Sequence, residues 1–299
     1  MNADTKALAE RGVMRALIYS DIFHFPLTGD ELWRFSETSV PLTKAEITAA
    51  VRRLRSKVRF QKNYYCLRGK ADIVNRRLEY IHLQKNKLNV ASNMARLLSH
   101  IPTVRFIGIS GTVAVGSAEA GDDIDFFVIA ADKTLWITRA LMIVLLSLKG
   151  KRRARTGGKT RDMVCLNMIC EERSMGFDSS RRDIYTAREC VQMLPVFSRG
   201  NTYQAFLTRN SWIASFFANG YIYADRLDKK VQKENVSHLW TGFFGLPFFE
   251  KCAYRSQRFF MEKHRTRETV ERQFLALHPR DYRREVTAQF EAGVRATGY

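Results

Sequence analysis

The sequence lacks the residue patterns that mark secreted, zinc-binding or fibrous proteins. Its 5 cysteines are odd in number and form no C-x-x-C pair, so we expect buried, reduced thiols. Its 6 histidines show no H-E-x-x-H or His/Cys spacing, which argues against a zinc site. With only 6 prolines and 17 glycines, the chain is neither a fibrous repeat nor a low-complexity linker.

Long apolar segments are also missing. The N-terminal stretch MNADTKALAERG lacks the apolar core of a signal peptide, so we expect no signal peptide there. The most apolar run, residues 135–148, falls short of the roughly 20 residues that a membrane-spanning helix needs, and it contains Arg139. These features predict a core helix at this run, no membrane span and a cytoplasmic protein.

Acidic residues are few relative to basic ones. The chain has 49 Lys and Arg against 30 Asp and Glu, a formal net charge of +19. Such a surplus favours polyanionic partners such as nucleic acid, nucleotides or anionic lipid, although a basic surface without a special role is the alternative. At 299 residues and 45% hydrophobic content, the chain is long and apolar enough for two or three folded domains.

Residues 1–71 predict a small helical module. Thr28 and Thr43 each precede a helical pattern and are each followed three residues later by Glu, which is the spacing of a capping box. The aromatic, β-prone residues 58–69 then predict a hairpin. Three helices and a hairpin indicate a winged helix.

The third helix of this module and its hairpin carry a basic cluster. This cluster favours contact with the phosphates of RNA or DNA, and it consists of Arg52, Arg53, Arg55, Lys57 and Lys62. The first turns of the helix, KAEITAA, are poor in base-reading side chains. A role in protein docking or substrate orientation therefore stays open.

The middle of the chain alternates strand and helix patterns, which predicts a mixed α/β domain at residues 72–195 with a small mixed sheet. We expect a long linker helix at 72–99, strands at 104–110, 124–130 and 163–170, and a helix at 134–149. Residues 196–299 read as a helical region rich in aromatics.

Two aspartates stand at the start of the predicted strand 124–130. Its period of two places Asp123 and Asp125 on one face, where two carboxylates repel unless a cation lies between them. Mg²⁺ or Mn²⁺ suits such oxygen ligands. The preceding Gly111–Thr112 turn would present backbone N–H groups to a triphosphate. A solvated strand end is the alternative.

At these residues the chain resembles the polymerase beta-like nucleotidyltransferase superfamily, through SGTVAVG followed by GDDIDFF. The resemblance implies a central domain of that fold, with Asp123 and Asp125 as metal ligands. It also implies that Gly111 and Thr112, with Ser110 beside them, bind the triphosphate of an NTP. YSDIFHFPLT and CLN are similar to phrases in a group of bacterial predicted nucleotidyltransferases with an N-terminal winged helix.

The resemblance also implies a third carboxylate on a later strand. Asp162 lies at the start of the predicted strand 163–170, whereas Asn167 takes an inward position further along it. Asn can ligate a metal but cannot act as a base. Asp162 is therefore our candidate for the third catalytic residue, with Asn167 as the alternative.

A basic loop at residues 149–161 separates the two strands that carry these carboxylates. We predict that Arg152 and Arg153 clamp a triphosphate or RNA, and that Gly157 and Gly158 let the loop close. The alternative is a solvated loop.

The sequence thus predicts a metal-dependent nucleotidyltransferase that moves an NMP from an NTP to an acceptor, with RNA or protein favoured. One rival is a catalytically silent, nucleotide-sensing regulator that binds nucleic acid. Another is a small-molecule transferase of the aminoglycoside-modifying kind. Base preference, acceptor and oligomeric state do not follow from these residues.

Overall fold

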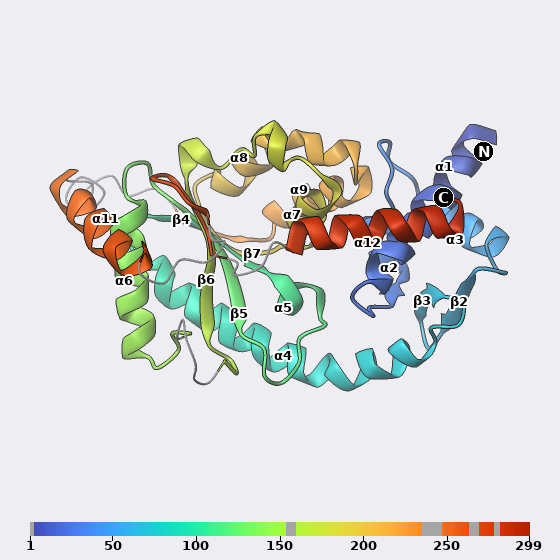
Figure 1. Cartoon of the computed structure of the whole chain (residues 1–299), viewed down its shortest axis with the longest axis horizontal. Helices are drawn as coiled ribbons and strands as arrows, with labels where there is room; N and C mark the ends of the chain where they lie inside the picture. Colours follow the sequence, from blue (N-terminus) through green and yellow to red (C-terminus); the bar gives the residue numbers. More distant parts are fainter. Residues whose placement is uncertain (1–2, 154–159, 235–246, 263–268, 278–281) are drawn as a thin grey trace.

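The computed structural model describes residues 3–153, 160–234, 247–262, 269–277 and 282–299 (Figure 1). Its N-terminal elements are α1 (Ala3–Asp21), β1 (Leu27–Thr28), α2 (Gly29–Phe35), α3 (Lys44–Arg53), β2 (Val58–Gln61) and β3 (Tyr64–Leu67). The strands form an antiparallel sheet in the order β1-β3-β2. Both predicted capping boxes form, at Thr28 before α2 and at Thr43 before α3. The predicted hairpin is confirmed as β2 and β3.

A single helix connects this small sheet to a larger one. The helix, α4 (Asp72–Ser99), has the bounds expected from the sequence and runs along the lower side of the view in Figure 1. Of its residues, Ala91, Ala95 and Leu98 are buried against the larger sheet.

The larger sheet is mixed and has the order β8-β7-β4-β5-β6-β10-β9. Its strands are β4 (Val104–Ser110), β5 (Ile124–Ala130), β6 (Val164–Glu171), β7 (Leu194–Arg199), β8 (Gln232–Glu234), β9 (Thr269–Val270) and β10 (Phe274–Ala276). The pairs β5/β6 and β7/β8 are parallel, and the others are antiparallel. A mixed α/β fold is therefore shown, and the strands predicted at 104–110, 124–130 and 163–170 are confirmed.

The sheet is larger than the sequence suggested, because the C-terminal region is not purely helical. That region also supplies β8, β9 and β10, and β10 pairs with the outer edge of β6. Such short strands give little periodic signal, yet they cover backbone groups of β6 that would otherwise form an open edge. The predicted domain boundaries at 71/72 and 195/196 stay predictions.

Helices cover both faces of this sheet (Figure 1). They are α5 (Gly111–Val115), α6 (Leu135–Leu148), α7 (Ile184–Gln192), α8 (Thr202–Arg209), α9 (Ala218–Asp228), α11 (Pro247–Glu262) and α12 (Tyr282–Thr297), with short 3₁₀ turns η1 (Glu172–Ser174), η2 (Ser179–Arg181) and η3 (Ser211–Ser215). The core helix predicted at 135–148 is α6. Within the described ranges, no helix has the length and apolarity to cross a membrane.

The alternation of β5 divides the core in two. Ile124, Phe126 and Val128 pack with α4, α6 and α11, whereas Phe127 and Ile129 face α7 and α8. The second cluster continues without a break into α1, α2 and α3. The N-terminal elements therefore share a core with one face of the large sheet, which is the face that carries the two aspartates.

Candidate active site

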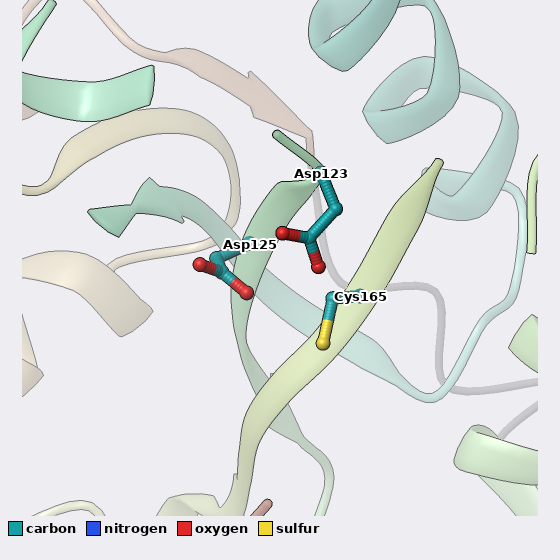
Figure 2. Close-up of side chains that lie close together, drawn as sticks. All are labelled: Asp123, Asp125 and Cys165. Atoms are coloured by element: carbon teal, nitrogen blue, oxygen red, sulfur yellow. The ribbon is translucent and has the colours of Figure 1, made fainter. Parts of the chain in front are cut away.

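Asp123 and Asp125 come together with Cys165 at one end of the large sheet. Asp123 directly precedes β5, Asp125 lies on it, and Cys165 is the partner of Asp125 on the parallel strand β6. One ligand atom from each of the three lies within 4.8 Å of the other two. Figure 2 shows the three side chains pointing into a common space. The two aspartates, predicted to share a face, thus lie close together, and their role as metal ligands stays a prediction.

Gly111 lies against this cluster, and its lack of a side chain is what permits that. It begins α5 at a φ of +64°, a left-handed conformation that favours glycine. A Cβ atom at Gly111 would lie 2.7 Å from Oδ2 of Asp125. The preceding residue, Ser110, is the register partner of Asp125 on β4. The β4–α5 turn and the carboxylate are therefore in direct contact.

The cluster is short of positive charge. Burial raises the pKa of Asp125 to about 7, and the neighbouring Asp123 carboxylate acts in the same direction. Burial and both carboxylates raise the pKa of the Cys165 thiol, which therefore stays protonated and hydrogen-bonds to Asp125. Arg153 compensates in part, because its guanidinium donates a hydrogen bond to Asp123. Arg153 thus lies at the cluster, and its predicted contact with a triphosphate or RNA stays a prediction.

Asp162 is not brought into the cluster. It has a φ of +57°, and its carboxylate lies 3.2 Å from Nζ of Lys87, a buried residue of α4. The same ammonium donates a hydrogen bond of 2.6 Å to the backbone carbonyl of Asp122. The structure therefore places Asp162 in a contact that fixes the loop before β5 to α4.

The other predicted site residues surround the cluster in different roles. The hydroxyl of Thr112 donates to Oδ2 of Asp122 at 3.2 Å, so it fixes the loop before the aspartate pair. Asn167 is the extra residue of a bulge between β5 and β6, two positions beyond Cys165. Arg152 is exposed and forms an isolated backbone bridge with Val164. Gly157 and Gly158 lie outside the described residues.

A cavity of about 680 Å³ opens beside the cluster, on the same face of the sheet. Ser110 at the end of β4 and Asn167 within β6 line it, as does Glu189 of α7. Burial raises the pKa of Glu189 to about 7. Glu189 is thus a third carboxylate in the region of the aspartate pair, and its charge acts on Asp125.

Sequence reasoning missed two residues of this region, Cys165 and Glu189. Cys165 had a usable signal, because it has the same strand parity as Asn167 and precedes it by two residues in the strand that follows the Asp pair. Glu189 had none, since an acid in a helical pattern reads as a solvated residue until the packing of α7 is known.

Comparisons of the chain with protein-family models, with curated proteins and with solved structures each gave no match. The functional interpretation consequently depends on the geometry of the site and on the local sequence pattern that builds it.

Proposed function

We propose that this protein is a metal-dependent nucleotidyltransferase that moves an NMP from an NTP to an acceptor. The observation that carries the proposal is the convergence of the Asp123 and Asp125 carboxylates, with a donor atom of each inside the 4.8 Å cluster, directly against the Gly111 turn. The arrangement supports the polymerase beta-like interpretation of the central domain.

The donor set fits a hard divalent cation. Burial, and after it the neighbouring Asp123 carboxylate, raise the pKa of Asp125, and a dication would offset both effects. Asp123 and Asp125 would hold Mg²⁺ or Mn²⁺, while the protonated thiol of Cys165 is a poor ligand for either. Once bound, such an ion supplies charge neutralisation for phosphoryl oxygens and lowers the barrier to attack at phosphorus.

The chain's own residues supply the remaining functions in this proposal. Gly111, Thr112 and Ser110 form the turn that contacts the nucleotide phosphates. Arg153 neutralises negative charge at the site, and the exposed Arg152 extends the positive surface toward solvent. Asp162 supports the loop before β5 through Lys87 rather than acting on the substrate.

A transfer assay tests this proposal. Purified protein is incubated with Mg²⁺ or Mn²⁺ and each α-labelled NTP, with total RNA, protein lysate or a small-molecule extract as acceptor. We expect label on one acceptor class and a loss of at least about a hundredfold in Asp125→Asn. Asp30→Asn, which removes an exposed carboxylate on α2, is the matched control. Transfer that survives in Asp125→Asn refutes the assignment.

A catalytically silent nucleotide sensor that binds nucleic acid is the second candidate. Two observations favour it: Arg153 already neutralises Asp123, and Asp162 is absent from the cluster of described side chains. The element order α1-β1-α2-α3-β2-β3 supports a winged helix, and Arg52 in its α3 and Arg55 just after that helix are exposed.

Binding measurements separate the two candidates. The sensor predicts NTP binding without transfer to any acceptor. It also predicts duplex binding that weakens steeply with salt and is lost in Arg52→Glu/Arg55→Glu. Transfer that depends on Asp125 excludes it.

A further inference from the structure

The cavity beside the aspartate pair is built like a small-molecule site. Its volume of about 680 Å³ lies within the roughly 300–1,000 Å³ of typical ligand pockets. Most of its lining is apolar or aromatic, from both the sheet and the helices above it; its large apolar and aromatic side chains are Phe127, Met168, Phe177, Tyr185, Met193, Phe206, Phe274 and Tyr282. A largely apolar space that reaches Ser110, the register partner of Asp125, would hold the body of an acceptor.

The charges of the lining argue against a nucleic acid in this cavity. Arg181 lies 2.8 Å from Glu271, and Arg283 lies 3.0 Å from Asp183. Both cations are therefore already paired with carboxylates, whereas a phosphate backbone is held by a row of cations that it neutralises itself. An RNA strand would gain little from this lining.

The same charges argue against a polycation of the aminoglycoside kind. Recognition of several ammonium groups requires several carboxylates, but among the described residues that line the cavity Glu189 alone is acidic, against Arg181, Arg283 and Arg284. The ion pairs of Arg181 and Arg283, together with the apolar lining, favour an uncharged molecule with an apolar body.

Glu189 is placed to act on the reacting group of such a molecule. It projects from α7 and lines the same cavity as Ser110, the register partner of Asp125. Gln192, one turn along, donates a hydrogen bond to its Oε1 and so fixes the carboxylate. A hydroxyl between Glu189 and the strand end at Ser110 would lie next to the aspartate pair.

We propose that the acceptor is a small, uncharged alcohol or phenol with an apolar or aromatic body, bound in this cavity; this rests on the proposed transferase function. The acceptor oxygen forms a bond to the α-phosphorus of the NTP. The bond from that phosphorus to the bridging oxygen of the β-phosphate breaks, and pyrophosphate leaves with the electron pair. The hydroxyl proton goes to Glu189 and then to water.

Naphthol is the probe, because it joins an aromatic body to one hydroxyl and is fluorescent. Its binding to the full chain is titrated in the wild type and in Ala276→Trp, which fills the cavity from β10. Thr269→Trp also fills the cavity, and because β9 is the edge strand of the sheet, we expect this variant to disturb folding less. Val144→Trp adds the same ring at a half-exposed position of α6 on the opposite face and is the control.

We expect one naphthol per chain, with binding weakened about tenfold in a folded cavity-filling variant and unchanged in the control. With Mn²⁺ and labelled NTP, naphthol should become labelled. Glu189→Gln should retain naphthol binding and lose transfer about a hundredfold.

Other results overturn the acceptor proposal. They are absence of naphthol binding, equal binding to every variant, or label on RNA, protein or kanamycin while naphthol stays unlabelled. Failure of the transferase function itself looks different, because no acceptor of any class would then become labelled, whether or not NTP binds with Mn²⁺, although naphthol still occupies the cavity. The acceptor assignment falls in that case too.

Discussion

A guanidinium nitrogen of Arg153 donates a hydrogen bond to Oδ2 of Asp123 and lies 3.6 Å from Sγ of Cys165. The protein therefore brings its own cation to two of the three groups of the cluster. Since Asp123 is also a proposed metal ligand, Arg153 and a divalent ion compete for the same carboxylate. If the proposed NTP binds, a guanidinium released from Asp123 would be in place to contact phosphate.

Replacing Arg153 by Gln should therefore have opposite effects on metal and nucleotide. Without the competing cation, Mn²⁺ affinity in the absence of nucleotide should rise about fivefold, which corresponds to a partly exposed ion pair of about 1 kcal/mol. Affinity for the NTP should fall, because a phosphate contact is lost. Calorimetric titrations with Mn²⁺ alone and then with NTP measure both.

Arg152→Gln is the matched control for that experiment. Arg152 carries the same charge one residue earlier in the chain, but its side chain is exposed. Its Mn²⁺ affinity should match the wild type within about twofold. An unchanged Mn²⁺ affinity in Arg153→Gln would show that the arginine does not compete for Asp123.

Gly111→Ala should damage the site beyond its cost to backbone stability. The positive φ of +64° makes any side chain strained, and the new Cβ would lie 2.7 Å from Oδ2 of Asp125. We expect a loss of about 1–2 kcal/mol in the free energy of unfolding and at least about tenfold weaker Mn²⁺ binding.

Gly69→Ala separates these two effects. Gly69 has a φ of +91°, yet nothing lies within 4 Å of the position its Cβ would take. It should show similar destabilisation in thermal unfolding and unchanged Mn²⁺ binding. Equal metal affinity in both variants would mean that contact with Asp125 is unimportant.

Local patterns explain why much of the fold was predictable. The capping boxes at Thr28 and Thr43 depend on residues three apart, and both form as the spacing requires. The alternation of β5 likewise fixes Asp123 and Asp125 on one side without knowledge of any neighbour.

The rest of the site depends on contacts between distant segments. Cys165 reaches Asp125 only through the parallel register of β5 and β6, which is displaced by the bulge that holds Asn167. Asp162 pairs with Lys87, which lies 75 positions earlier in the chain. The strand pattern alone therefore gave no sign that Asp162 would lie outside the cluster. The short strands β8 and β10 of the C-terminal region also could not be predicted, because they form only by pairing with the distant strands β7 and β6.

Asp162→Asn distinguishes a supporting residue from a catalytic one. The variant weakens the contact with the buried ammonium of Lys87, which keeps its hydrogen bond to the Asp122 carbonyl. We expect a loss of about 1–2 kcal/mol in chemical denaturation, with Mn²⁺ affinity unchanged. If Asp162 were the third catalytic carboxylate, transfer would fall by orders of magnitude in protein that is still folded.

The pH dependence of stability should report the buried carboxylate of Glu189. Its pKa in the folded protein is about 7, above the 4.5 of an ordinary Glu, so between these values the folded state holds more protons than the unfolded one. The free energy of unfolding should therefore fall as pH rises through this window. Asp125, with a raised pKa of about 7, contributes in the same direction.

Glu189→Gln isolates the contribution of Glu189, because the amide cannot ionise. The Glu189 carboxylate interacts electrostatically with five charged or titratable groups: Arg188, Asp125, Tyr19, Tyr185 and Cys190. Since Arg188 opposes the shift and the variant leaves Asp125 in place, the pH slope should become shallower without vanishing. Relative to the wild type, the variant should gain stability from pH 5 to pH 8, by about 1 kcal/mol or more. Urea unfolding at several pH values measures this difference, and parallel curves for the two proteins would show that Glu189 ionises normally.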